Sequence, residues 1–229
     1  MRKDENILVI KGLEKSFKGQ LILQDVNLSI SKGEIVGIVG SNGSGKTTLL
    51  KLILGLSYPE KGDIMVRGKR VFPGLLGDLP TRVGALIENP TFLPQFSGIK
   101  NLTMLASIRK EIGKSDIENA MKEMGLDPNN KKAVSKYSLG MRQRLGIAQA
   151  IMEKPELVLF DEPTNGLDSD GVELFSKVVN RMKAEGVSFI IVSHRKDEID
   201  SLCDTIYKIE NRGLHKVNEY PASFKENVE

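Results

Sequence analysis

A glycine-rich segment at residues 40–47 has the residue types and the spacing of a phosphate-binding loop. Its sequence, GSNGSGKT, matches the pattern G-x-x-x-x-G-K-[ST]. The apolar run at 34–39 before it predicts a short buried strand, and residues 48–54 after it predict the start of a helix. Glycines allow successive backbone N–H groups to point at phosphate oxygens, and a helix N-terminus adds unpaired donors. The segment therefore predicts a binding site for a nucleoside triphosphate.

Two residues of this loop have a specific expected task. Lys46 is expected to reach the β- and γ-phosphates, and the hydroxyl of Thr47 is expected to hold Mg²⁺. The residues predicted to contact the nucleotide are Ser41, Asn42, Gly43, Ser44, Gly45, Lys46, Thr47 and Thr48. The alternative, a glycine-rich turn with an incidental lysine, leaves the flanking strand and helix unexplained.

A pair of carboxylates follows a second apolar run. Residues 157–160 read LVLF and predict a central strand, after which come Asp161 and Glu162. Ligands of α/β proteins bind at the C-terminal ends of the strands. We expect Asp161 to hold Mg²⁺ opposite the phosphate loop, and Glu162 to orient and polarise an attacking water. A merely solvated strand end is the alternative, and the phosphate loop upstream disfavours it.

The order of the apolar runs predicts an α/β fold. Strands are expected at 7–17, 21–30, 63–67, 83–87, 157–160 and 187–192. The first two alternate apolar and polar residues and are joined by a turn at Lys18, with a break near Asp25. A helix at 172–184 separates the last two strands, and this strand–helix–strand order predicts a parallel sheet.

The composition changes at residue 89, where proline and polar residues lead into two stretches of helical periodicity at 99–112 and 116–124. We interpret 89–152 as a helical lobe inserted between strands. The whole chain, 1–229, is then expected to be one domain, with residues 1–88 and 153–229 forming the core.

The bulk composition excludes several other classes of protein. The net charge of +3 and the lack of a basic stripe with aromatic residues give no indication of nucleic-acid binding. The single cysteine, Cys203, excludes an internal disulfide and a multi-cysteine metal site. No apolar run approaches the roughly 18 residues needed to cross a bilayer, and residues 1–6 lack the apolar core of a secretory signal. A cytoplasmic location is therefore expected.

A third motif lies shortly before the carboxylate strand. Residues 137–144 read YSLGMRQR and resemble the L-S-G-G-Q signature of ATP-binding cassette (ABC) ATPases. Ser138 and Gly140 match the signature, whereas Leu139 and Met141 replace its second glycine and its glutamine. In that family the segment grips the γ-phosphate of a nucleotide held by the opposite subunit. By itself this degenerate motif is no more than a helix N-cap.

The remaining motifs of the family follow in order. Residues 163–168, ending at Asp168, resemble the D-loop that crosses between subunits, and Ser193-His194 resembles the switch histidine that senses the γ-phosphate. Phe17 stands where the family stacks an aromatic ring on adenine. A lone histidine at a strand end is more often structural, and Phe17 also suits core packing; only the order of the motifs favours the functional reading. The resemblance covers about residues 5 to 217.

The resemblance implies a fold, a reaction and a set of partners. The fold is a P-loop NTPase (RecA-like) core with an N-terminal antiparallel β part and an inserted helical lobe. The reaction is ATP + H₂O → ADP + phosphate with Mg²⁺, catalysed at the interface of a head-to-tail homodimer or of a pair with a related ATPase subunit. Separate integral membrane permease subunits are the other implied partner, and they place the chain on the cytoplasmic face of the membrane.

One position departs from the family pattern. Members have a glutamine where the chain enters the helical lobe, and the aligned residue here is Glu88. We expect Glu88 to contact the metal or the attacking water and to couple ATP to the membrane partner. The Ile87-Glu88-Asn89-Pro90 run, together with the Ser-Leu-Gly-Met signature, is similar to the ATPases of lantibiotic-immunity and bacitracin-resistance exporters.

Two other classes of function remain as alternatives. Non-transport ABC proteins carry two cassettes or a long coiled coil between the phosphate loop and the signature, and this chain has one cassette and a short lobe. A different phosphate-loop enzyme, such as a small-molecule kinase or a GTPase, would not require the signature, the D-loop and His194 together. The main interpretation is therefore the ATPase subunit of a multicomponent exporter; the sequence does not identify its cargo.

Overall fold

An antiparallel sheet forms one side of the molecule. The computed structural model describes residues 6–74 and 80–218, and its four-stranded sheet has the order β2-β1-β4-β5. The strands are β1 (Asn6–Phe17), β2 (Gln20–Ser31), β4 (Lys61–Val66) and β5 (Lys69–Arg70). The predicted hairpin of β1 and β2 is confirmed, and Asp25, where a break was expected, has a left-handed φ of 48°.

The second sheet has six strands in the order β10-β9-β3-β8-β7-β6. Its strands are β3 (Ile35–Val39), β6 (Val83–Leu86), β7 (Leu157–Asp161), β8 (Ser188–Val192), β9 (Thr205–Glu210) and β10 (Gly213–Val217). All neighbours pair in parallel except β10, which is antiparallel to β9. The predicted parallel sheet is therefore confirmed, whereas β9 and β10 were not predicted.

The central strands are apolar because both of their faces are covered. Every residue of β3, β7 and β8 is buried, and successive residues contribute to opposite faces. On one face Phe160 packs edge-on against Phe175 at a centroid distance of 5.3 Å. On the other face Leu159 and Ile190 join the core under the antiparallel sheet and α1 (Lys46–Ile53).

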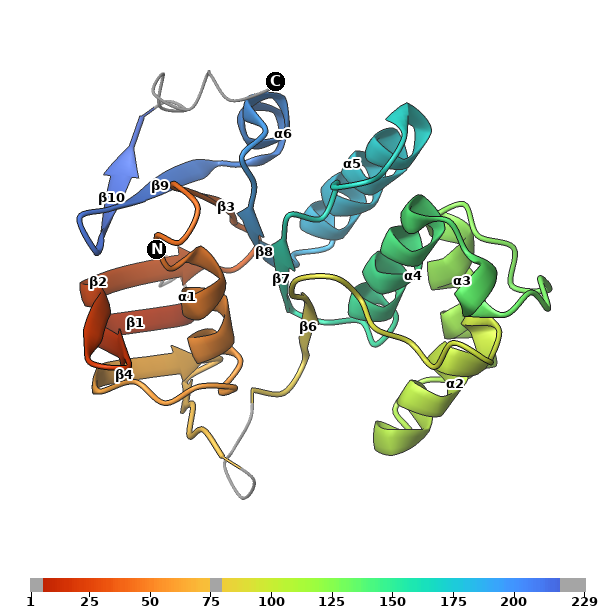
Figure 1. The fold of residues 1–229 in the computed structure, drawn as a ribbon, viewed down its shortest axis with the longest axis horizontal. Helices are drawn as coiled ribbons and strands as arrows, with labels where there is room; N and C mark the ends of the chain where they lie inside the picture. Colours follow the sequence, from red (N-terminus) through yellow and green to blue (C-terminus); the bar gives the residue numbers. More distant parts are fainter. Residues whose placement is uncertain (1–5, 75–79, 219–229) are drawn as a thin grey trace.

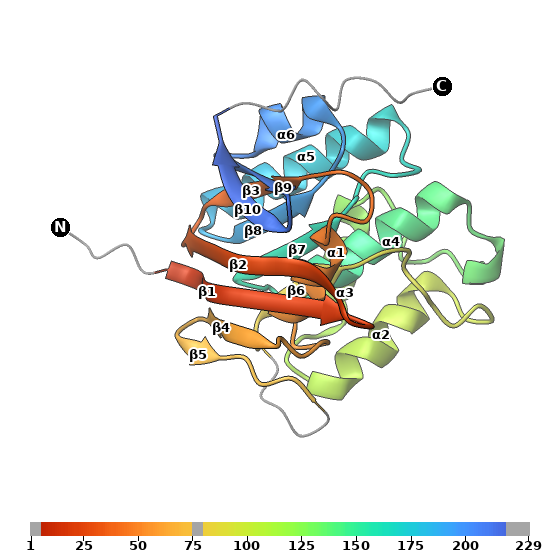
Figure 2. The same cartoon turned by 60° about the vertical axis from the view of Figure 1, so that its left-hand side comes forward.

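The helices form two groups. The three helices of the predicted lobe, α2 (Gly98–Arg109), α3 (Lys114–Glu123) and α4 (Leu139–Ile151), lie together on the side away from the antiparallel sheet (Figure 1). α5 (Ser169–Ala184) and α6 (Lys196–Leu202) lie on the same side of the chain as β9 and β10 (Figure 2). A 3₁₀ turn, η1 (Val134–Lys136), precedes α4.

One close approach fixes the lobe to the six-stranded sheet. A Cβ atom on Gly84 of β6 would lie 1.9 Å from the carbonyl oxygen of Ala150 in α4. Only glycine allows the strand and the helix to pack at this distance. Among residues 6–74 and 80–218, no helix is long and apolar enough to span a membrane. Residues 1–5 and 219–229 lie outside the described residues. The prediction that the chain lacks a secretory signal rests in part on residues 1–5.

Candidate functional site

The phosphate loop connects β3 to α1 and is shaped by two glycines. Gly43 and Gly45 have φ values of 78° and 107°, which are left-handed conformations that side chains disfavour. The buried Lys46 side chain folds back over this loop, where its Nζ donates to the carbonyl oxygens of Gly40 at 2.7 Å and Ser41 at 3.0 Å. Burial lowers the pKa of Lys46, and the nearby carboxylate Glu162 opposes this shift. The lysine is therefore held where phosphate oxygens could replace carbonyl oxygens as its acceptors.

Asp161 at the end of β7 lies against the start of α1. The hydroxyl of Thr47 donates to Asp161 Oδ2 at 2.6 Å. Burial raises the pKa of Asp161, while the hydrogen bond from Thr47 and the charge of Lys46 oppose the shift. The two side chains that are each predicted to hold Mg²⁺ are therefore in direct contact.

The donor set at this point fits Mg²⁺. Mg²⁺ is usually bound by one or two carboxylates together with substrate phosphates and waters, and not by an all-protein cage. The described residues hold no group of three or more His, Cys, Asp or Glu side chains that could bind a metal ion. The buried Ser44 Oγ makes no hydrogen bond to any described residue, so the loop also keeps a polar atom available to a phosphate or a water.

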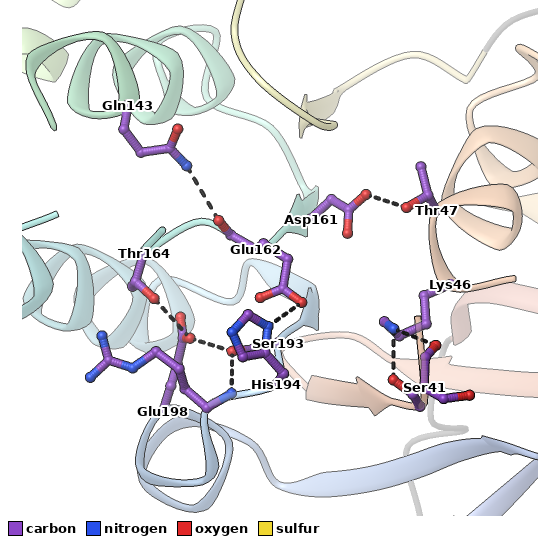
Figure 3. A network of polar contacts seen from close by, with 12 residues as sticks. Ser41, Lys46, Thr47, Gln143, Asp161, Glu162, Thr164, Ser193, His194 and Glu198 are labelled. Carbon is purple, nitrogen blue, oxygen red and sulfur yellow. Dashed lines mark hydrogen bonds and ion pairs between the residues drawn. The ribbon is translucent and has the colours of Figure 1, made fainter. Parts of the chain in front are cut away.

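Glu162 and His194 face each other beside the loop (Figure 3). His194 Nδ1 lies 2.9 Å from Glu162 Oε1. Glu162 has a left-handed φ of 51°, and its amide donates to the carbonyl oxygen of Val192 in β8. The buried Gln143 of α4 donates to the carbonyl oxygens of Glu162 at 3.3 Å and Pro163 at 2.8 Å. The structure thus brings together Glu162, which is predicted to orient water, and His194, which is predicted to sense the γ-phosphate. Gln143 of the lobe holds the backbone that carries Glu162.

A further carboxylate, Glu198 of α6, was not predicted. Its Oε2 accepts hydrogen bonds from the hydroxyls of Thr164 at 3.0 Å and Ser193 at 2.6 Å (Figure 3). The sequence signal that could have identified Glu198 is an acidic residue next to the apolar Ile199, on the buried face of a short helix. The helix itself was not predicted, so this signal could not be used.

A cleft of about 720 Å³ joins the phosphate loop to Asp161 and Glu162. Its lining includes Lys15, Phe17, Asn42, Gly43, Gly45, Lys46, Thr47, Thr48, Lys51, Glu88, Gln143, Asp161 and Glu162. Phe17 is 65% exposed at the edge of this cleft, so the alternative of core packing is wrong. An exposed ring at the cleft is consistent with stacking on a base.

Glu88 lies in the same cleft, on the segment that enters the lobe. Its Oε1 accepts from Lys51 Nζ of α1 at 2.6 Å, and its φ of 58° is left-handed. The charge of Glu88 also acts to raise the pKa of Asp161. From the sequence, Glu88 was predicted to contact Mg²⁺ or the attacking water. In the structure it lies close enough to Asp161 to affect its pKa, and its carboxylate contacts Lys51.

Ser138, Gly140 and Asp168 do not line the phosphate cleft. They line a second hollow of about 600 Å³. Ser138 caps α4 by accepting from the amide of Met141, and Asp168 caps α5 by accepting from the amide of Gly171. Asp168 also pairs with Arg144 of α4. The chain therefore carries two separate hollows, one lined by the phosphate loop and one lined by the signature segment and Asp168.

The fold and the cleft define the class of protein. The chain has a parallel sheet, a glycine-rich loop after β3, a lysine that folds over that loop and a carboxylate at the end of β7. These features define a P-loop nucleoside triphosphatase.

The comparisons with known proteins narrow this class to one family. The model of the ABC transporter family matches residues 23–165. The uncharacterized ABC transporter ATP-binding protein YybJ of Bacillus subtilis is 40% identical, over 93% of this chain and 96% of its own. A solved structure of the ATP-binding subunit of an ABC transporter superposes with a TM-score of 0.81 at 25% identity, over 92% of this chain and 89% of that one.

Two relatives have a named transport role. The bacitracin transport ATP-binding protein BcrA of Enterococcus faecalis is 38% identical, over 88% of this chain and 66% of its own. The lantibiotic transport ATP-binding protein SrtF of Streptococcus pyogenes is 34% identical, over 97% of this chain and 94% of its own. The chain belongs to the ABC transporter family as an ATP-binding protein and ATPase. The resemblance and the fold inferred from the sequence motifs are confirmed.

The buried Glu198 gives a testable pH dependence. Burial raises the pKa of Glu198 in the folded chain above its unfolded value, so its contribution to stability is full below the unfolded pKa and is lost as pH rises through the folded pKa. Glutamine does not titrate. Glu198→Gln should therefore stabilise the nucleotide-free protein more at about pH 8 than at about pH 5.

Urea unfolding of wild type and variant at both pH values measures this difference. A difference in unfolding free energy that stays constant or shrinks as pH rises would contradict the assigned pKa direction.

Proposed function

We propose that this chain is the ATP-hydrolysing subunit of an exporter and that it works as a head-to-tail pair around Mg-ATP. The pair consists of two copies of this chain, or of this chain with a related ATPase subunit. Separate membrane permease subunits carry the cargo, which we propose to be an antimicrobial peptide or drug. The named roles of BcrA in bacitracin transport and SrtF in lantibiotic transport support this choice of cargo.

The separation of the two hollows carries the proposal of a pair. The phosphate cleft contains Lys46, Thr47 and Asp161 but not Ser138, whose helix N-terminus opens into the other hollow. A helix N-terminus capped by a serine favours an anion. In a head-to-tail pair, Ser138 and Gly140 of each copy would face the phosphates held by the other copy, and both sites would be completed.

The residues of the cleft have distinct roles in the proposed reaction. Lys46 and the loop amides bind the phosphates, and Phe17 stacks on adenine. Glu162 orients and polarises the attacking water, and His194, 2.9 Å away, holds Glu162 and contacts the γ-phosphate. When bound to Thr47 and Asp161, Mg²⁺ would neutralise charge on the phosphates.

The permease is proposed to dock on the helical lobe and on the loop at 88–98 that leads into it. Leu93 in this loop and Met104 and Ile108 of α2 are large apolar side chains with exposed surface, and Ile108 is 77% exposed. Phe92 instead packs partly against the core. Docking at this surface would place the chain on the cytoplasmic face of the membrane, and nucleotide-driven closure of the pair would act on the permease.

Glu162→Gln should accumulate an ATP-bound pair. The amide keeps the shape of the side chain but cannot accept a proton from water, so turnover should fall by about 10²-fold or more while binding is retained. Light scattering at saturating Mg-ATP should give twice the protomer mass. Glu173→Gln, on the exposed surface of α5, is the matched control and should leave turnover unchanged. Detection of monomer alone for Glu162→Gln would count against the shared site.

Glu88→Gln tests the departure from the family pattern. Removing this charge should raise the Mg²⁺ concentration for half-maximal ATPase rate by about two- to fivefold, because exposed charge interactions are worth at most about 1 kcal/mol. Magnesium titrations of ATPase rate, and transport in vesicles with the permease, measure the effect. Glu111→Gln, at an exposed position of the lobe, provides the control. If Glu88→Gln left both ATPase rate and transport intact, the proposed role of Glu88 would be wrong.

A further inference from the structure

Glu198 is a buried carboxylate that has no role in the reaction proposed above. Its residue is only 5% exposed. Oε2 accepts from two hydroxyls, those of Thr164 and Ser193, and Oε1 makes no hydrogen bond to any described residue. A buried polar atom without a partner is rare in folded proteins and requires an explanation.

The position of α6 does not require this carboxylate. Ile199 and Leu202 on the same helix are buried and join the core around β7 and β8. An apolar residue at 198 would anchor the helix without the desolvation cost that raises the pKa of this carboxyl. Its benefit therefore lies in the two hydroxyls that it binds.

These hydroxyls belong to the two loops that carry Glu162 and His194. Thr164 lies two positions after Glu162, and Ser193 directly precedes His194. Ser193 Oγ in turn accepts from the amide of Arg195, which fixes the turn on the other side of His194. A single carboxylate oxygen thus connects both loops, and Glu162 and His194 project from them toward each other (Figure 3).

We propose that Glu198 is a positioning residue for ATP hydrolysis: by holding Thr164 and Ser193 to one oxygen, it sets the separation of Glu162 and His194. The inference rests on the proposed roles of those two residues and is independent of how two copies pair. Gln143 and the backbone bond from Glu162 to Val192 also support Glu162. Loss of Glu198 should therefore weaken catalysis without abolishing it.

The test compares Glu198→Ala and Glu198→Gln with Glu162→Gln and wild type in steady-state ATPase assays. Glu198→Ala should lower kcat by about tenfold with KM for ATP within about twofold, since one lost positioning interaction corresponds to about a factor of ten in rate. Glutamine retains a carbonyl oxygen that accepts from both hydroxyls, so Glu198→Gln should restore kcat to within about threefold of wild type. Asp200→Asn, an exposed carboxylate of the same helix paired with Lys196, should leave kcat unchanged.

Two further measurements separate positioning from loss of fold. Hydrogen exchange of the nucleotide-free protein should accelerate in Glu198→Ala at 162–168 and 193–196, with β7 and β8 still protected. In a Thr164→Val, Ser193→Ala background, adding Glu198→Ala should cause no further loss of kcat, because the hydroxyls through which it acts are gone.

Each remaining outcome is decisive. Unchanged kcat in Glu198→Ala while Glu162→Gln is inactive would overturn the inference alone. Full activity of Glu162→Gln would overturn the proposed reaction on which it rests. Three further outcomes would overturn the proposal that Glu198 acts by positioning the two loops through these hydroxyls. They are a kcat loss that Glu198→Gln does not restore, an additive loss in the Thr164→Val, Ser193→Ala background, and faster exchange spread over β7 and β8.

Discussion

The contact between Thr47 and Asp161 is the constraint on which the site depends. It joins the loop after β3 to the end of β7, two strands that are separated in the sheet by β8 alone. Parallel pairing brings all three strand ends to one edge, so the hydroxyl, the carboxylates and His194 meet there. Burial disfavours the charged forms of both Lys46 and Asp161. A triphosphate and a cation would supply each with an opposite charge, which explains why these charges are kept in a half-buried cleft.

A second feature is that the signature segment lies apart from the phosphate cleft. Phe17 and Glu88 line the phosphate cleft, whereas Ser138 and Asp168 line the other hollow. The lobe nevertheless contacts both regions, because Gln143 of α4 supports Glu162 while the N-terminus of the same helix carries Ser138. A movement of α4 would therefore change the surroundings of both Glu162 and Ser138.

Local patterns predicted most of the fold and the centre of the site. The apolar runs of β3, β7 and β8 are continuous because both faces of the sheet are covered, and the loop and the Asp161-Glu162 pair directly follow two of them. The strands β9 and β10 and the seven-residue α6 were missed because half-exposed or short elements carry little periodicity.

Contacts between distant segments were beyond local patterns. The spacing of Lys51 and Glu88 in the sequence does not predict their ion pair, because the pair depends on how the segment entering the lobe packs against α1. The same holds for Glu198, whose partners Thr164 and Ser193 lie in the loops that follow β7 and β8. Asp168 was expected at the end of a loop that crosses between subunits, and within this chain it pairs with Arg144 and lines the same hollow as Ser138.

Complementation between two inactive variants tests the shared site most directly. Lys46→Ala removes the phosphate-loop lysine, and Ser138→Arg blocks the signature segment, so each variant alone should have two defective sites per pair. In a mixture, a hybrid pair combines the intact loop of one chain with the intact signature of the other. An equal mixture should recover about a quarter of the wild-type ATPase rate, since about half of the pairs are hybrids with one intact site each. A rate no higher than the sum of the two variants alone would contradict a site built from two chains.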